Sequence, residues 1–286
     1  MMQKIIIGTA NFSGKYGFIN AKEVDSVEIS EIINLAQVRG INHFDTAKSY
    51  GNAEEVLGSR LDRSQPIVID SKVNKKECLS VDSIVRAAQD TIEKAGVTKI
   101  STLYLHNFEL VAADEQNIVK NGLEKVLELE LANHIGVSVY TQSELINAKK
   151  LYSRLSHFQI IENICDRRLY DSSEIMEFAE SGNSINVRSI FLQGILLSDP
   201  NKLQDKFKLA FDATNSLNHY AGSQKVSVLD LCLAYAKSIK WASKIVIGID
   251  SKKQLEEILK SNYNLTVGWQ DEIPTIPTSL LDPRFW

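Results

Sequence analysis

Short apolar runs alternate along the whole chain with longer segments in which apolar residues recur every three or four positions. The short runs are rich in Val, Ile and Phe, which favours β-strands. We predict strands at Lys4–Gly8, Asn42–Asp45, Ile67–Asp70, Thr102–Leu105, His134–Ser138, Phe158–Ile161, Ile185–Ile190 and Lys244–Gly248. The segments between them have helical spacing, as in the stripe Ile29, Ile32, Ile33 and Ala36, so strands and helices take turns along the chain.

The predicted helices begin and end at specific local signals. A Glu or Gln three residues after a Ser, Thr, Asp or Asn is typical of a helix start. Such pairs occur at Asn52/Glu55, Thr141/Glu144, Asp171/Glu174 and Ser251/Gln254. Glycine readily takes the left-handed conformation that follows a helix, so we expect helix ends at Gly40 and Gly96.

The alternation predicts parallel strands joined by crossover helices that cover the sheet. The chain has 286 residues, and a (β/α)8 barrel needs about 250. We therefore predict the α/β class, a (β/α)8 TIM barrel, as a single domain over residues 1–286 with a C-terminal tail from about residue 265.

Two segments fall outside this pattern. The longest segment predicted to be irregular runs from Leu197 to about Ser223, and a loop of that length is usually functional or a lid. The tail, which carries Phe285 and Trp286, either covers the open end of the barrel or packs on an outer helix.

Composition narrows the class of protein. Hydrophobic residues make up 44% of the chain and charged residues 24%, as in ordinary soluble proteins. The net charge of −4 gives no sign of a nucleic-acid surface, and no apolar run approaches the roughly 20 residues of a membrane span. The N-terminus lacks the features of a signal peptide, and the 3 cysteines lie far apart without metal spacing. These features predict a cytoplasmic protein with no nucleic-acid, membrane or metal partner.

The segment Gly40–Gly58 carries the strongest chemical signal. An apolar strand ends in Asp45, and Tyr50 follows in a loop bounded by glycine before the next helix. In a (β/α)8 barrel the C-terminal ends of the strands carry the chemistry. An acid and a phenol are therefore expected together at the reacting end of the barrel.

This segment resembles the signature of the aldo-keto reductases, and the resemblance spans roughly Ile5 to Leu259. It implies NAD(P)H-dependent reduction of an aldehyde or ketone, with Asp45, Tyr50, Lys72 and His106 as the catalytic residues. The runs 163–168 and 188–194 look like a bacterial branch associated with polysaccharide and sugar biosynthesis, which points to a small carbonyl or sugar-like substrate.

The types of these residues suit carbonyl reduction. The reaction needs a proton donor at the carbonyl oxygen, and a free tyrosine with a pKa of about 10 is a poor acid near pH 7. A nearby ammonium lowers the pKa of a phenol, so we expect Lys72 to act on Tyr50 and Asp45 to hold Lys72 charged. His106 is expected to orient the carbonyl oxygen or to assist proton transfer.

The resemblance also implies a set of nicotinamide contacts. Ser138 and Gln159 match the positions that hold the carboxamide, although Val139 replaces the usual asparagine. Arg188 stands where an aromatic residue usually stacks on the nicotinamide, and a guanidinium can also stack on a ring. Further contacts are expected from the end of the first strand and from the loop after the seventh, at Gly8, Thr9, Ser189, Phe191, Gln193 and Gly194.

The helix after the eighth strand is expected to hold the adenosine end of the cofactor, because a helix N-terminus favours phosphate. The resemblance assigns Ser251 and Gln254 to a phosphate and Glu257 to the adenine amine. Lys252 and Lys253 suit a 2′-phosphate, whereas Asp250 would repel one. On balance we predict NADP(H) over NAD(H).

Two other functions stay open at this point. One is a nicotinamide-binding regulatory or sensor protein with little turnover. The other is a barrel lyase in which Lys72 forms a Schiff base, although a neighbouring Asp45 would keep that lysine protonated. The substrate, the direction of the reaction and the choice between monomer and homo-oligomer are left undetermined.

Overall fold

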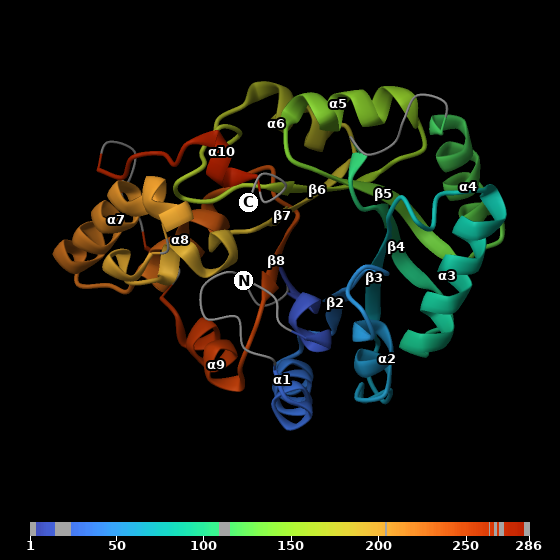
Figure 1. Cartoon of the computed structure of the whole chain (residues 1–286), viewed down its shortest axis with the longest axis horizontal. Helices are drawn as coiled ribbons and strands as arrows, with labels where there is room; N and C mark the ends of the chain where they lie inside the picture. The colour runs from blue at the N-terminus through green and yellow to red at the C-terminus, as the bar shows by residue number, and fades with distance from the viewer. Residues whose placement is uncertain are drawn as a thin grey trace.

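Eight parallel strands form a closed barrel in the order β1 to β8, and the helices lie around it (Figure 1). The computed structural model describes residues 4–14, 24–108, 115–203, 205–262, 264, 265, 268 and 272–282. Each strand pairs with the next along the chain, and β1 closes the ring by pairing with β8. The predicted (β/α)8 barrel is confirmed.

The strands are short and almost wholly buried, because side chains fill the barrel interior and helices cover its outside. They are β1 (Ile5–Gly8), β2 (His43–Asp45), β3 (Val68–Val73), β4 (Ile100–Leu105), β5 (Ala132–Val139), β6 (His157–Ile161), β7 (Ser184–Arg188) and β8 (Lys244–Gly248). Each predicted strand overlaps an observed one, with ends that differ by a few residues.

Most helices connect one strand to the next, and the others lie within the loops or follow β8. The α-helices are α1 (Ser26–Val38), α2 (Ala53–Gly58), α3 (Val81–Ala95), α4 (Gln116–Glu128), α5 (Gln142–Leu151), α6 (Ser173–Glu180), α7 (Phe211–Gln224), α8 (Val228–Ser238), α9 (Lys252–Lys260) and α10 (Thr278–Leu281). Short 3-10 helices occur at η2 (Ala10–Ser13), η4 (Leu192–Leu197), η5 (Pro200–Lys202) and η6 (Asp205–Ala210). None of the helices in the described ranges is long and apolar enough to cross a membrane.

The predicted helix boundaries agree with the structure except at α6, and Asn52 directly precedes α2 as predicted. Thr141 and Ser251 cap α5 and α9 as predicted. Helix α6 is capped by Ser172 and not by Asp171, so that prediction is wrong by one residue. The side chain of Asn52 makes no capping hydrogen bond to α2. Glu54, in the first turn of α2, is buried and accepts hydrogen bonds from the hydroxyl groups of Ser71 and Thr91.

The segment from Leu197 to Ser223 is largely helical, so its prediction as an irregular loop is wrong. It contains η5, η6 and most of α7. In α7 the residues Ala213, Leu217 and Ala221 are buried on one face. Their spacing of four is helical, but Asn, Thr and Ser between them weaken the apolar pattern in the sequence.

The described part of the tail packs on the loop after β6. The backbone N–H of Ile276 donates to the carbonyl of Cys165 at 2.9 Å, and the Arg167 guanidinium donates to the carbonyl of Ile273 at 2.9 Å. None of the described tail residues lines the large cavity of the barrel. Phe285 and Trp286 lie outside the described residues.

Candidate active site

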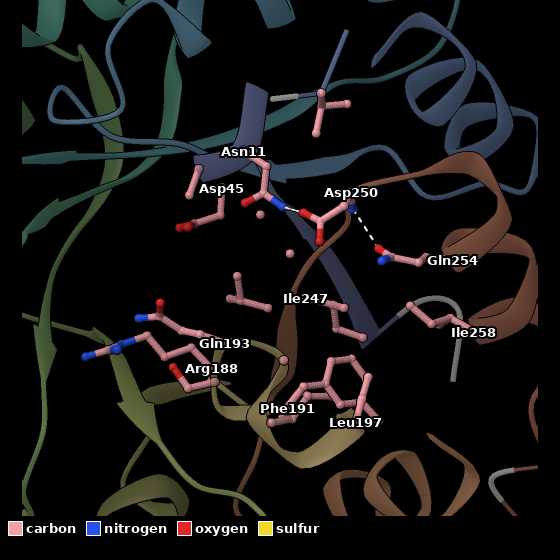
Figure 2. Close-up of a pocket in the computed structure, with 18 of the residues that line it drawn as sticks. Asn11, Asp45, Arg188, Phe191, Gln193, Leu197, Ile247, Asp250, Gln254 and Ile258 are labelled. Carbon is pink, nitrogen blue, oxygen red and sulfur yellow. Dashed lines mark hydrogen bonds between the residues drawn. The ribbon is translucent and has the colours of Figure 1, made fainter. Parts of the chain in front are cut away.

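A cavity of about 1300 Å³ opens at the C-terminal end of the barrel (Figure 2). Residues that pair on neighbouring strands lie at the same height along the barrel. Gly8 pairs with both Asp45 and Gly248, and Ser138 pairs with Gln159, so these lining residues lie side by side around the cavity. All of the residues predicted to be catalytic line this cavity, namely Asp45, Tyr50, Lys72 and His106.

Asp45 and Lys72 form a buried ion pair at the base of the cavity. Their side chains are 4% and 2% exposed. The Lys72 ammonium donates to Asp45 Oδ2 and, at 3.1 Å, to the carbonyl oxygen of Thr46. Gln159 Nε2 donates to the other carboxylate oxygen of Asp45 at 2.6 Å. The lysine is thereby held in one position, with its charge balanced by the carboxylate.

Tyr50 lies beside this pair. Lys72 Nζ lies 5.3 Å from the centre of the Tyr50 ring, and the His106 ring meets the Tyr50 ring edge-on with centroids 5.8 Å apart. Burial raises the pKa of the Tyr50 phenol, Asp45 raises it further, and the Arg188 guanidinium lowers it. The expected net lowering of this pKa by Lys72 is therefore wrong, because Asp45 balances the charge of Lys72 and burial outweighs Arg188.

His106 follows β4 and is neutral at physiological pH. Burial, Lys72 and Arg188 together lower the pKa of its imidazole to about 3. The Ser49 hydroxyl lies 3.1 Å from Nδ1. When that hydroxyl donates to Nδ1, the ring proton is on Nε2, which is then a hydrogen-bond donor.

Ser138 and Gln159, the residues expected to hold a carboxamide, lie in the cavity with polar atoms available to a ligand. Ser138 is 2% exposed and lines the cavity. The Oε1 atom of Gln159 is buried and has no hydrogen-bond partner among the described residues. A buried acceptor without a partner is costly, and the NH2 group of an amide ligand would satisfy it. Both side chains therefore fit the nicotinamide group that the sequence implies.

Arg188 stacks on a protein side chain. Its guanidinium lies 4.4 Å from the centre of the Tyr140 ring, and Nη2 donates to the carbonyl of Val139 at 3.2 Å. Its Nε atom is buried without a partner in the described structure. Arg188 thus presents one face to Tyr140 and brings positive charge close to Tyr50 and His106.

The loop after β7 lines the middle of the cavity through Ser189, Phe191, Gln193 and Gly194. Its backbone is unusual: φ is 61° at Ser189, 52° at Gln193 and 91° at Gly194. Only glycine adopts such angles without cost. Residues other than glycine held there at a cavity are characteristic of functional loops.

The other residues predicted to bind the cofactor, from the end of the first strand and from the helix after the eighth, are only partly together. Gly8, Ser251, Gln254 and Glu257 line the cavity. Thr9 does not line it, and its hydroxyl donates to the carbonyl of Asp45 at 3.1 Å.

The two lysines expected there also lie outside the lining. Lys253 is 85% exposed on its side chain and lies 3.9 Å from Glu257. Lys252 pairs with Glu31 at 3.2 Å. Both ammonium groups are thus paired with carboxylates.

Sequence reasoning missed several residues of the site. Asn11, Asp25, Glu28 and Tyr140 line the cavity, and Ser49 contacts His106. Ser49 had a signal, because it lies between Asp45 and Tyr50 in the same loop. The others had none, because their positions depend on how distant elements pack. Among the described residues no cluster of His, Cys, Asp or Glu could hold a metal ion.

Comparison with known proteins identifies the family. The model of the Aldo/keto reductase family matches residues 4–274. D-arabinose 1-dehydrogenase of Saccharomyces cerevisiae is 22% identical over 290 residues, which cover 91% of this chain and 84% of that protein. A protein of Oryza sativa subsp. japonica named probable voltage-gated potassium channel subunit beta is 22% identical over 296 residues, covering 91% of this chain and 87% of that protein.

Solved structures share the fold. A glycerol dehydrogenase from Gluconobacter oxydans superposes with a TM-score of 0.69 at 17% identity, covering 93% of this chain and 88% of that one. A thermostable aldo-keto reductase in complex with the inhibitor epalrestat gives a TM-score of 0.69 at 20% identity, covering 94% and 92%. With the family match across nearly the whole sequence, this chain belongs to the aldo/keto reductase family.

Proposed function

We propose that the chain reduces the carbonyl group of a small aldehyde or ketone to an alcohol, with a reduced nicotinamide dinucleotide as hydride donor. The observation that carries this proposal is the meeting of Tyr50, His106 and the Asp45–Lys72 pair in one cavity with the partnerless amide oxygen of Gln159. The relatives named as dehydrogenases of arabinose and glycerol support a sugar-like, polyhydroxylated substrate.

The cofactor would supply the hydride, and the protein's own residues would handle the proton. The Tyr50 phenol keeps its proton at neutral pH, as an ordinary tyrosine does, and it would serve as the general acid at the carbonyl oxygen. The Nε2–H of neutral His106 would donate a hydrogen bond to the same oxygen and orient it. As the proton leaves Tyr50, the charge of Arg188 would stabilise the phenolate.

The two forms of the cofactor differ only in a 2′-phosphate. The sequence favours NADP(H) through Lys252 and Lys253, but neither lysine lines the cavity. The proposal that the chain binds a nicotinamide dinucleotide of either form is supported by the family match and by Ser138 and Gln159, which fit a carboxamide.

A sensor function is the second candidate, because one relative is named as a channel subunit. The intact catalytic residues favour turnover. The Schiff-base alternative is disfavoured by the contact between Lys72 and Asp45, because a protonated amine is not a nucleophile. A cytoplasmic location fits the three buried free thiols, Cys78, Cys165 and Cys232.

The test is a panel of aldehydes, ketones and sugars with NADH and NADPH, followed by loss of absorbance of the reduced nicotinamide. We expect turnover with at least one polyhydroxylated carbonyl. Tight cofactor binding with no turnover on the whole panel would favour the sensor function. Borohydride trapping of a substrate on Lys72 would favour the lyase.

A further inference from the structure

Charge is distributed unevenly along the cavity. Among the described residues, the cations of its lining are Lys72 and Arg188, and both lie at the catalytic end. Carboxylates line the other end, beside α1 and α9, at Asp25, Glu28, Asp250 and Glu257. Figure 2 shows Asp45 and Arg188 on one side of the cavity, with Asp250, Gln254 and Ile258 on the other. A dianionic phosphate at that other end would meet like charges.

Asn11 and Asp250 together present acceptors to this end. Asn11 follows β1 and is 5% exposed, and its amide nitrogen donates to Oδ1 of Asp250, which follows the neighbouring strand β8 (Figure 2). With the nitrogen engaged, the remaining polar atom of Asn11 is Oδ1, which is buried and has no hydrogen-bond partner among the described residues. A ligand that satisfies this atom has to be a donor, and a hydroxyl group is one.

The N-terminus of α9 is already occupied by a carboxylate. Free N–H groups at a helix start are the usual anchor for a phosphate. Here the backbone N–H of Lys252, the first residue of α9, donates to Oε1 of Glu28 from α1. The Gln254 N–H donates to Ser251 Oγ at 3.1 Å, and Gln254 Oε1 accepts from the Asp250 N–H at 2.7 Å. The protein's own groups therefore fill positions that a phosphate would need.

From these contacts we infer that this end of the cavity takes an adenosine ribose with a free 2′-hydroxyl and rejects a 2′-phosphate, so that the chain uses NAD(H). The inference rests on the proposed nicotinamide function and reverses the expectation of NADP(H). Asp250 and Asn11 accept hydrogen bonds from the ribose hydroxyls. Glu28 excludes the phosphate by charge and by occupying the start of α9.

The test measures binding without turnover. NADH and NADPH are titrated separately into the protein and followed by fluorescence of the reduced nicotinamide. For the unmodified protein we expect the Kd of NADH to be lower than that of NADPH by about tenfold or more, the effect of one charge-assisted contact. Asp250→Asn should weaken NADH and strengthen NADPH. Glu28→Gln should strengthen NADPH and leave NADH nearly unchanged.

The matched control is Glu256→Gln, which removes the same charge from α9 at a residue that pairs with Lys260 and does not line the cavity. Its ratio of the two Kd values should stay that of the unmodified protein. Equal or tighter binding of NADPH by the unmodified protein overturns the inference and leaves the proposed reduction standing. The inference also fails if Asp250→Asn and Glu28→Gln change the ratio no more than the control does. Failure of both dinucleotides to bind overturns the proposed function and the inference with it.

Discussion

Tyr50 lines the cavity with a phenol that keeps its proton, and its ring lies beside both His106 and the Lys72 ammonium. We expect Tyr50→Phe to lower the rate of carbonyl reduction by about 10²–10⁴-fold, the usual contribution of a general acid. The Kd of the reduced cofactor should be nearly unchanged, since the hydroxyl acts on the substrate oxygen. Steady-state rates and fluorescence titration measure the two quantities. A variant with near-normal turnover would show that another group donates the proton.

Arg188 acts on Tyr50, the proposed acid, through its charge. Its guanidinium lowers the pKa of Tyr50 against the effect of burial, so Arg188→Met should raise that pKa. Reduction requires the protonated phenol, and its rate falls as pH rises through the pKa of Tyr50. The falling limb of the pH–rate profile should therefore move to higher pH in Arg188→Met. Arg188→Lys keeps the charge and is the control, with a smaller movement expected. If the falling limb lies at the same pH in the unmodified protein, Arg188→Met and Arg188→Lys, Arg188 does not act on the pKa of Tyr50.

At the scale of elements, helix α2 holds the loop that carries Tyr50. Glu54 on α2 is 3% exposed. It accepts hydrogen bonds from Lys48 at 2.8 Å and from Ser71 and Thr91 at 2.7 Å each. Lys48 belongs to the Tyr50 loop, and its backbone N–H donates to the carbonyl of Lys72. Glu54 thus ties the loop that carries Tyr50 to β3 and α3.

We expect Glu54→Gln to lower the free energy of unfolding by about 2–3 kcal/mol, because one partner of a largely buried ion pair loses its charge. It should also lower kcat more than it changes the Kd of the cofactor, since Tyr50 is displaced. Asp90→Asn removes the other, half-exposed partner of Lys48 and should cost less in both measurements. Denaturant unfolding and steady-state kinetics test this. Equal losses in the two variants would mean that Glu54 has no special role in positioning the loop.

At the scale of the whole molecule, one buried carboxyl links stability to pH. Glu162 follows β6 and is fully buried, and Tyr235 of α8 donates to it at 2.6 Å. Burial raises the pKa of Glu162 to about 8, against the opposing hydrogen bond from Tyr235. The native state therefore keeps a proton that the unfolded chain loses near pH 4.5. Stability from this group is present at low pH and is lost as pH rises through about 8.

Between pH 6.5 and 8 the free energy of unfolding should therefore fall in the unmodified protein. Glu162→Gln cannot ionise, so its free energy of unfolding should stay flatter over the same range. The largest difference in slope from one such group is about 1.4 kcal/mol per pH unit. Glu256→Gln, an exposed change of the same kind, should keep the original slope. The same slope in Glu162→Gln would show that this carboxyl is not the titrating group.

The sequence alone determined the fold and the placement of the catalytic end. Strand and helix periodicity are local properties, and eight alternating units in a chain of this length leave few arrangements other than a closed barrel. Parallel strands in chain order bring all their C-terminal ends to one side. Asp45, Lys72 and His106 each lie at or next to such an end, so their meeting followed from their positions along the chain.

Only the tertiary structure decided how charge is distributed along the cavity and which groups occupy the start of α9. The Glu28 carboxylate reaches the start of α9 across 224 residues of sequence because α1 and α9 pack side by side. No local pattern shows that contact, or that Lys252 pairs with Glu31 of α1. The pKa of Tyr50 likewise depends on burial by surrounding elements and on Arg188 from β7. Local periodicity sets which elements form, whereas burial and long-range electrostatics depend on how those elements pack, and here they set the chemistry of the site.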